Sequence, residues 1–374
     1  MTSSQPVKIY QNELNEPTTA NVFIGDVKHL SSYNWLERST PTIAVPGLPN
    51  EWISPSHPIR VRLKRRLIFI DQNAYRLPRT PLEPLFRALY IENPTFDIGS
   101  VHVVADDTTI RKFLSFVAPD AEKSFTPFRV RAELVKETLL FTRVETESRT
   151  YIRPEHPSSY SRSFIEKSTE RPTHECTSHY RIISYNFAGL KFLIRHESDA
   201  YIPAQDSDAS STHSHPTQER NTSPERGRSR TRSQPPQPLR IPGSHLEILK
   251  VGEVVPRETT IEIQTRNYRT HLTPKDVAAK MWVSRVPNLV RAFYQDRDFN
   301  VPTVEDVRDE VMHWQTTHQV ELCHLGALLN RIYHGVKRLG GGGIITTDTP
   351  GEVMTIEEAE TGNMLPRDLY SRWD

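Results

Sequence analysis

The chain has 374 residues, a length that fits one large α+β domain or two small domains. Its 47 Lys and Arg residues against 46 Asp and Glu residues give a net charge of +1, so any binding of nucleic acid or cations must be local. The two cysteines, the absence of a long apolar stretch and a polar N-terminus exclude a disulfide scaffold, a membrane span and a multi-cysteine zinc module. We expect an intracellular protein from a reducing compartment.

One long segment, residues 203–243, departs from globular composition. Its apolar residues are two alanines, one leucine and one isoleucine, and arginines alternate with small polar residues between 226 and 232. Such a segment cannot bury enough apolar surface to offset the entropy of ordering. We therefore expect a flexible segment at 1–30, a single α+β domain formed by 31–202 and 244–374, and a disordered Arg/Ser/Pro-rich insertion at 203–243.

The remaining sequence is divided into short elements by its hydrophobic periodicity. Residues 31–53 mix aromatics with turns and prolines, which predicts an ordered but irregular arm. The later patterns predict, in chain order, a strand at 66–71, a helix at 81–90, a strand, turn and helix at 101–117, an antiparallel hairpin at 128–144, two strands in each of 180–201 and 246–267, a helix between Pro274 and Pro287, and a strand at 288–294.

The last region is dominated by an apolar stripe from Val304 to Leu339 at steps of three and four. Thr303 and Asp306 are spaced as in a capping box, and four glycines at 340–343 would end the helix. We expect one long C-terminal helix packed on its own domain, with a coiled-coil seam as the alternative.

Two strand motifs carry acidic or amide side chains at a spacing of two residues. They place Glu197 with Asp199, and Glu262 with Gln264, on one face of each strand. If the strands are neighbours, three carboxylates converge, which is the ligand type that Mg²⁺ and Mn²⁺ prefer. A cation there could activate water and stabilise charge on a phosphate in transit. The alternative is that both motifs are ordinary solvated strand faces.

A family resemblance favours the first interpretation. The stretches YNFAGLKFLIRHESDAY, EIQTR and MWVSRVPNLVRAFYQD resemble the DXO-type decapping exoribonuclease family, which has a PD-(D/E)XK nuclease-like core. With SSYNWLERSTPTIAVPG and DQNAYRLPRTPLEP, the chain resembles more closely an uncharacterised fungal group related to that family. The resemblance implies an α+β fold with a mixed sheet flanked by helices, Mg²⁺ or Mn²⁺ as cofactor, and RNA as partner.

The resemblance also implies roles for individual residues. Glu197 and Asp199 match the family's Glu-x-Asp metal motif, Glu262 matches the acid of its Glu-x-Lys motif, and Glu166 is the best match to a further upstream acid. Gln264 stands where the family has a lysine that orients or deprotonates the attacking water. A neutral amide can position water but supplies no charge and no base, so we expect weakened hydrolysis.

A second departure lies further upstream. The family's substrate-end Arg-Gly falls near Asp106 and Asp107, which would repel a phosphate unless Arg111 or Lys112 compensates.

Three functions are compatible with these observations. The first is a divergent metal-dependent nuclease-like protein that acts on RNA 5′ ends. The second is a catalytically inactive relative that binds nucleic acid, or a protein partner through the Arg-rich insertion. The third, isoprenoid diphosphate synthesis, follows the geranylgeranyl pyrophosphate synthase label of the fungal group; it requires an all-α fold, and the chain has no pair of Asp-Asp-x-x-Asp motifs.

Overall fold

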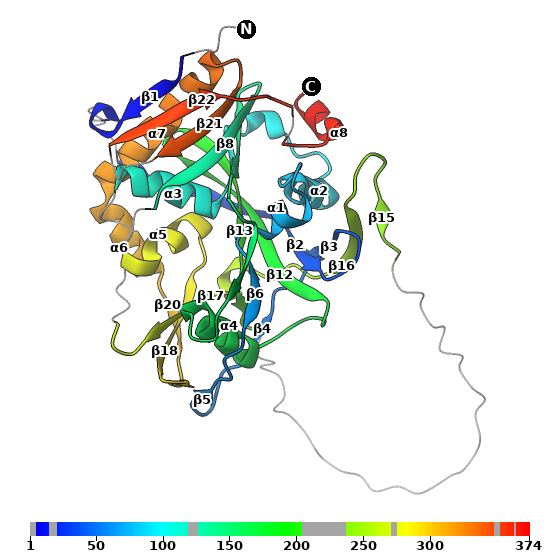
Figure 1. Ribbon diagram of the computed structural model, residues 1–374, viewed down its shortest axis with the longest axis vertical. Coiled ribbons are helices and arrows are strands. Elements are labelled where there is room, and N and C mark those ends of the chain that lie inside the picture. Colours follow the sequence, from blue (N-terminus) through cyan, green and yellow to red (C-terminus); the bar gives the residue numbers. More distant parts are fainter. Residues whose placement is uncertain are drawn as a thin grey trace, which may run out of the picture.

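The computed structural model describes residues 5–14, 21–118, 126–203, 237–270, 275–347, 352–362 and 364–374. A twelve-stranded mixed sheet runs through the molecule, a second sheet of eight strands lies below it in the view of Figure 1, and a two-stranded ribbon accompanies the second sheet.

The strands of the large sheet have the spatial order β1-β22-β21-β8-β9-β7-β13-β12-β2-β3-β16-β15. Their bounds in that order are β1 (Val7–Tyr10), β22 (Val353–Glu358), β21 (Gly342–Thr347), β8 (Phe128–Val135), β9 (Thr138–Arg143), β7 (Val103–Asp106), β13 (Leu190–Glu197), β12 (Cys176–Phe187), β2 (Gly25–Leu36), β3 (Thr42–Gly47), β16 (Glu247–Gly252) and β15 (Leu239–Arg240).

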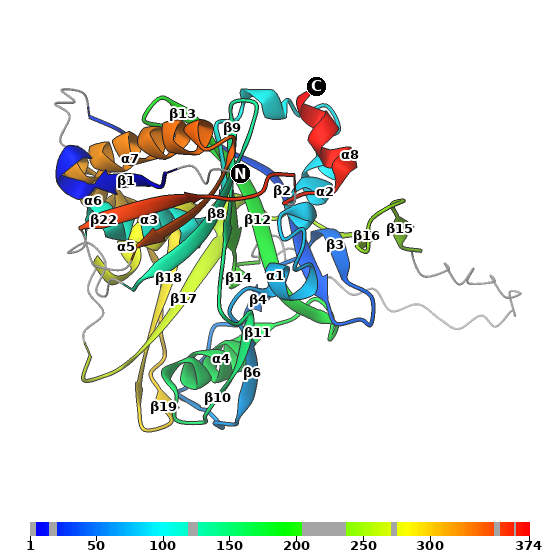
Figure 2. The same cartoon turned by 45° about the horizontal axis from the view of Figure 1, so that its top comes forward.

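Both faces of the large sheet are covered by helices, which explains why its central strands are apolar without strict alternation. On β12, Ile183 packs toward one core and Ile182 toward the other, because successive side chains point to opposite faces. The first core contains residues of α3 (Asp107–Val117), α5 (Lys275–Ser284), α6 (Arg308–Thr317) and α7 (Gln319–Arg338), and the second contains residues of α2 (Glu83–Glu92) and α8 (Arg367–Tyr370). Figure 2 shows these two groups of helices on opposite sides of β12.

The second sheet follows the order β11-β4-β14-β17-β18-β19-β5, with β20 also paired to β18. Its bounds are β11 (Thr169–Glu170), β4 (Glu51–Trp52), β14 (Ala200–Tyr201), β17 (Thr260–Asn267), β18 (Asn288–Gln295), β19 (Asp298–Phe299), β5 (Ile59–Arg60) and β20 (Val304–Asp306). Helix α4 (Pro157–Ser168) contributes Phe164 to a third core with this sheet.

The ribbon pairs β6 (Arg66–Phe69) with β10 (Arg149–Ile152) in antiparallel register. The short helix α1 (Gln72–Arg76) follows β6 directly and is capped by Asp71, whose Oδ1 accepts a hydrogen bond from the Ala74 amide at 2.9 Å. The remaining short elements are the 3₁₀ turns η1 (Gln11–Leu14), η2 (Ile98–Ser100), η3 (Arg257–Thr259) and η4 (Ser371–Trp373).

The predicted α+β class with a mixed sheet, flanking helices and a long C-terminal helix is confirmed. The strand at 66–71, the helix at 81–90, the unit at 101–117 and the hairpin at 128–144 are present with boundaries shifted by a few residues. Lys136, with a φ of 52°, provides the turn of that hairpin. The mixed sheets contradict the all-α fold that an isoprenoid diphosphate synthase needs, and this alternative is therefore excluded.

Three local predictions were wrong. Residues 31–53 form central strands β2 and β3 rather than an irregular arm, because β2 finds antiparallel partners in β12 and β3. The N-terminal segment is not wholly flexible, since β1 pairs with β22. The C-terminal stripe begins with strand β20, paired with β18, and its helix breaks at His318; an apolar pattern alone does not reveal these pairings.

Most of the predicted insertion, residues 204–236, lies outside the described residues, as does the cap expected at Thr273 and Pro274. Within the predicted insertion, Leu239 and Arg240 form strand β15 at the edge of the large sheet. No helix in the described ranges is long and apolar enough to cross a membrane.

Candidate active site

A cleft of about 630 Å³ opens where the ribbon, α4, the ends of β12 and β13 and the first turns of α3 meet. Its lining is rich in charge. The charged residues lining it are Lys64, Arg65, Arg66, Asp106, Asp107, Arg111, Arg143, Arg162, Glu166, Arg171, Arg195, Glu197, Asp199 and Lys280.

Behind the cleft wall lies a buried carboxylate, Glu262, which does not itself line the cleft and is held by an amine from a helix. Glu262 on β17 is only 2% exposed, and its Oε1 accepts a hydrogen bond from Gln264 Nε2 at 2.7 Å, as expected for two residues on one strand face. The same Oε1 accepts from Lys280 Nζ, which comes from α5. Lys280 also lines the cleft. The ammonium group of Lys280 therefore contacts the carboxylate of Glu262, even though residue 264 is not a lysine.

Burial and neighbouring charges perturb the protonation of this centre. Burial raises the pKa of Glu262 to about 7, opposed by Lys280 and reinforced by Asp199. Burial alone would lower the pKa of Lys280, but the carboxylates of Glu262, Asp199 and Asp107 outweigh it and raise that pKa. Lys280 therefore stays charged at neutral pH, whereas Glu262 can both hold and release a proton.

Glu197 and Asp199 lie in the same cleft, but not on one continuous strand. Strand β13 ends at Glu197, which is exposed. Asp199 follows it, and its Oδ2 accepts from the Ile263 amide of β17 at 2.8 Å. Burial raises the pKa of Asp199, and Glu197 adds to this effect. Asp199 is close enough to raise the pKa of Glu262 through its charge, whereas Glu197 lies at the exposed side of the cleft.

Glu166 on α4 lines the cleft as well. Both of its oxygens accept from Arg66, and Lys64 Nζ lies 3.8 Å from Oε2. Burial tends to raise the pKa of Glu166, but these cations outweigh it and lower the pKa. The structure therefore places Glu166 in the cleft as a carboxylate already matched by an arginine.

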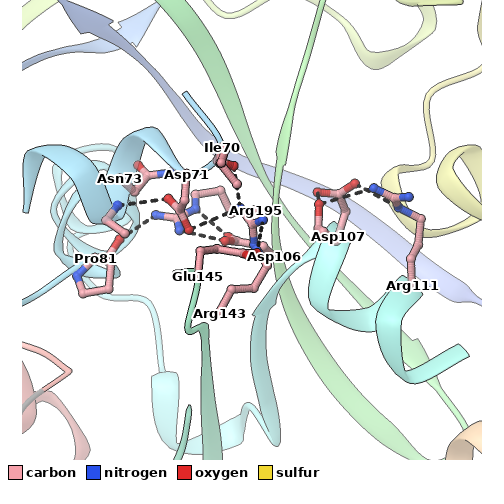
Figure 3. A network of polar contacts seen from close by, with 12 residues as sticks. Ile70, Asp71, Asn73, Pro81, Asp106, Asp107, Arg111, Arg143, Glu145 and Arg195 are labelled. Atoms are coloured by element: carbon pink, nitrogen blue, oxygen red, sulfur yellow. Dashed lines mark hydrogen bonds and ion pairs between the residues drawn. The ribbon is translucent and has the colours of Figure 1, made fainter. Parts of the chain in front are cut away.

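Asp106 and Asp107 do not act as two free acids. In Figure 3 their side chains point apart, Asp106 toward Arg195 and Asp107 toward Arg111. Arg195 binds Asp106 through two hydrogen bonds of 2.6 and 3.0 Å, and Arg111 Nε lies 3.5 Å from Asp107. Burial would raise the pKa of Asp107, but Arg111 and Lys280 outweigh it and lower that pKa. Burial raises the pKa of Asp106, and Arg195 only partly opposes this.

The donor atoms suit a hard divalent cation, but their arrangement is not a closed site. Glu197, Asp199, Glu262 and Glu166 offer carboxylate oxygens, the ligands that Mg²⁺ and Mn²⁺ prefer. Among the described residues, however, no group of three or more His, Cys, Asp or Glu side chains is placed to hold a metal ion. Lys280 and Gln264 share Glu262 Oε1, and a cation at this acid must bind beside them.

Two exposed arginines near the acids of the cleft are left for a ligand. Arg162 on α4 and Arg171 after β11 are exposed, and neither forms an ion pair with a described residue. The charge of Arg162 partly opposes the raised pKa of Asp199, and that of Arg171 contributes to the lowered pKa of Glu166, so both arginines lie in the field of the acids. The positive charges of Arg162 and Arg171 can neutralise anionic groups that enter the cleft.

Sequence reasoning missed Lys280. The position lies 18 residues beyond Glu262, in a helix that we expected from its apolar face alone. The available signal was weak: a lysine within the buried run Ala278, Ala279 and Met281 is unusual, because a buried ammonium requires a partner.

Comparisons with solved structures find the same fold in proteins of very different sequence. S. pombe Rai1 aligns with a TM-score of 0.57 and 10% identity over 95% of this chain and 100% of that chain. Candida albicans Rai1, solved in complex with pU5-Mn2+, aligns with a TM-score of 0.54 and 10% identity over 99% of each chain. K. lactis Dxo1, solved in complex with manganese, aligns with a TM-score of 0.53 and 9% identity over 95% of this chain and 98% of that chain.

At these identities the comparison shows the fold, and it confirms the fold implied by the DXO-type resemblance. No protein with a curated description matches the chain in sequence. A family model described as "Domain of unknown function (DUF8563)" matches residues 5–369. The chain therefore belongs to the DUF8563 family, whose fold in this protein is that of the Rai1 and Dxo1 structures.

Proposed function

We propose that this chain is a divergent PD-(D/E)XK-type nuclease that hydrolyses phosphodiester or pyrophosphate bonds at RNA 5′ ends, with Lys280 in the role of the lysine missing at position 264. Glu262, Asp199 and Glu197 are the acids of the site, and Gln264 positions Glu262. Inactivity through the loss of the motif lysine is not favoured, because the amine reaches the same carboxylate from another element.

The proposal rests on one observation, which is that two side chains donate to the same oxygen of Glu262. Gln264 and Lys280 both donate to Glu262 Oε1, one from the strand and one from the helix packed beside it. In a Glu-x-Lys motif the strand supplies both acid and amine. Here the strand supplies acid and amide, and α5 supplies the amine.

The raised pKa of Lys280 defines its chemical role. An amine that stays protonated cannot act as a general base, but its charge can stabilise the negative charge that develops on a phosphate during attack. Glu262, whose pKa burial raises to about 7, must give up its proton to ligate a cation. A divalent cation bound by Glu197, Asp199 and Glu262 would lower the pKa of water and neutralise phosphate charge.

The cleft supports an anionic, extended substrate. Arg162 and Arg171 leave their guanidinium groups to a ligand, and Arg65 stands beside them at the same opening. Arginine matches the planar geometry of phosphate oxygens, and several such groups along one groove are typical of nucleic-acid backbone contacts. The RNA-bound and metal-bound forms named for the structural neighbours are consistent with this ligand class.

The proposal is tested with pure full-length protein on RNAs that carry a 5′ monophosphate, triphosphate or cap, each with Mg²⁺, Mn²⁺ or EDTA. We expect 5′-end hydrolysis by the wild type and a loss of about 10²–10³-fold in kcat for Lys280→Met, the range typical for removing one electrostatic stabiliser. Lys250→Met on the exposed edge of β16 is the matched control and should be unchanged.

An exchange variant tests whether the position of the amine or its presence matters. Gln264→Lys with Lys280→Gln restores the motif on the strand and should recover much of the activity lost by Lys280→Met. Gln264→Lys alone places a second ammonium at Glu262 and should not raise activity. Equal background turnover in the wild type, Lys280→Met and Glu262→Gln would contradict the proposal and leave a non-catalytic binding protein.

A further inference from the structure

The ribbon β6–β10 presents one face whose side chains differ from those of the rest of the cleft. Leu67 lies opposite Tyr151, and Phe69 lies opposite Arg149, so these four side chains share a face. The opposite face carries Ile152, which is buried, and Arg66, which binds Glu166 and Ser163 of α4. One face of the ribbon therefore anchors it, and the other remains open.

The open face combines rings with guanidinium groups. Tyr151 is 63% exposed and Leu67 38% exposed. Arg65 lies over the Tyr151 ring at 4.7 Å, and Arg149 lies over the Tyr75 ring at 4.6 Å and donates to the Tyr75 hydroxyl at 2.6 Å.

Tyr75 in turn packs against Phe69, with ring centroids 5.1 Å apart. The face therefore carries two groups of planar side chains, Arg65 over Tyr151 and Arg149 over Tyr75 with Phe69 tilted against it, joined by the pairing of Leu67 with Tyr151 and Phe69 with Arg149. We call this surface the ribbon face, formed by Arg65, Leu67, Phe69, Tyr75, Arg149 and Tyr151.

The charges on the ribbon face are available for an anionic ligand. Neither Arg65 nor Arg149 forms an ion pair with a described residue; both make ring contacts instead. The ribbon face is also continuous with the candidate active site, since Arg65, Leu67 and Phe69 line the same cleft as Asp199 and Lys280. A ligand whose phosphates follow the cleft therefore meets planar, partly apolar groups at its edge.

We propose that the ribbon face is a stacking platform for the bases of single-stranded nucleic acid whose phosphates lie in the cleft. This inference rests on the proposed function and extends it, because it restricts the substrate to unpaired strands. Bases stack on aromatic rings and guanidinium planes with little sequence preference, whereas the bases of a duplex are already stacked and face inward. Arg65 and Arg149, which form no ion pair with a described residue, favour a nucleic acid over an apolar protein segment at this face.

The test measures binding in EDTA, so that no turnover is needed. Fluorescence anisotropy compares a 5′-labelled A5 RNA with an abasic pentanucleotide of equal phosphate count, for the wild type and Tyr151→Ala. We expect Tyr151→Ala to weaken binding of A5 about tenfold, within the usual range for loss of one base stack, and to leave the abasic strand within twofold. Tyr151→Phe, which keeps the ring, should bind A5 like the wild type.

A substitution in the cleft serves as a control that separates phosphate contacts from base stacking. Arg162→Ser, in the cleft, should weaken binding of both oligonucleotides by the same factor, because the proposal places this arginine on the phosphates and not on the bases. A fully paired RNA duplex should show no effect of Tyr151→Ala. Because Tyr151 is largely exposed, its replacement should leave the melting temperature unchanged, which excludes unfolding as the cause.

The possible outcomes distinguish this inference from the proposed function. Equal weakening of A5 and the abasic strand by Tyr151→Ala, or no weakening of either, overturns the stacking platform even if the wild type hydrolyses RNA. The latter result would also direct attention to a protein partner for the ribbon face. Base-dependent weakening in a protein without hydrolytic activity would support the platform and reject the nuclease.

Discussion

Two buried clusters of charge lie close together in this protein and are built on different plans. The first, which we call the guanidinium network, consists of Asp71, Asp106, Arg143 and Arg195. Arg195 is 1% exposed and also donates to the Pro81 carbonyl at 2.9 Å, and Arg143 donates to Asp71 at 3.2 Å (Figure 3). Each carboxylate has a planar arginine partner.

The second cluster, the ammonium centre, consists of Glu262, Asp199, Asp107 and Lys280. The ammonium of Lys280 lies in the field of all three carboxylates, and within the described part of the chain its ion pair is with Glu262. Asp107 is also paired with Arg111. The lysine side chain is 27% exposed to the cleft.

The comparison shows which buried charges stabilise the fold and which are open to a ligand. A carboxylate matched by a bidentate guanidinium on adjacent strands fixes the register of β7 and β13, where Asp106 and Arg195 are direct partners. A raised carboxyl pKa does not separate the two clusters, because burial raises that of Asp106 as well as those of Glu262 and Asp199. The difference lies in the cation: Arg195 is closed off at 1% exposure, whereas the Lys280 side chain is 27% exposed and can meet a ligand.

The largest expected effect is on the guanidinium network. Arg195→Met leaves Asp106 buried without its partner and should lower the free energy of unfolding by about 3–5 kcal/mol, the usual cost of breaking a buried pair. Chemical denaturation followed by circular dichroism measures this. The double variant Arg195→Met with Asp106→Leu should recover a large part of the loss. A single variant as stable as the wild type would show that the network is dispensable.

Removal of the ammonium should affect the reaction more than the fold. Lys280→Met is expected to reduce kcat by about 10²–10³-fold, while its free energy of unfolding should change less than that of Arg195→Met, because Glu262 can take up a proton when its partner is lost. Steady-state hydrolysis of 5′-monophosphate RNA and denaturation of the same samples give both values. A greater stability loss for Lys280→Met than for Arg195→Met would reverse the assignment of the two clusters.

The pH dependence separates activity from stability. Because Glu262 has a pKa of about 7 without metal and must be deprotonated to bind a cation, the Mn²⁺ concentration needed for half-maximal activity should rise as pH falls below 7. The stability contribution runs the other way: the folded-state pKa exceeds the ordinary value of 4.5, so the folded protein binds more protons between these values, and stability from this group falls as pH rises from 4.5 to about 7.

Glu262→Gln should remove this pH dependence of stability. Its unfolding free energy, measured by urea titration at several pH values, should lack the decline that the wild type shows. An identical decline in both proteins would assign it to another group.

The smallest expected effect concerns the cations of the cleft wall. Arg162→Ser or Arg171→Ser should weaken RNA binding several-fold and reduce the slope of log affinity against log salt by about one unit each. Binding isotherms at four salt concentrations measure the slope. Arg60→Ser, which removes an exposed arginine paired with Asp298, is the matched control and should keep the wild-type slope.

The sequence already contained much of the fold, but only where local pattern and long-range pairing agree. The hairpin at Lys136 and the units at 101–117 and 81–90 are readable because short-range periodicity and turn chemistry specify them. The arm at 31–53 was misread because its strand character depends on β12, more than 140 residues away along the chain. The C-terminal stripe was misread as one helix because strand β20 depends on β18.

For the candidate site, the sequence by itself identified which acidic residues belong to it, whereas the tertiary structure set their neighbours and therefore their protonation. The spacing of two identified Glu262 with Gln264, and their hydrogen bond follows from strand geometry alone. The contact of Lys280 with Glu262 arises only because α5 packs on the same core as β13 and Lys280 reaches across to β17. No periodicity encodes where a side chain on one element meets a carboxylate on another. Likewise, Tyr151 joins Leu67 only through the pairing of two short strands far apart in the chain. Local patterns fix which face a residue takes, whereas packing fixes what that face meets.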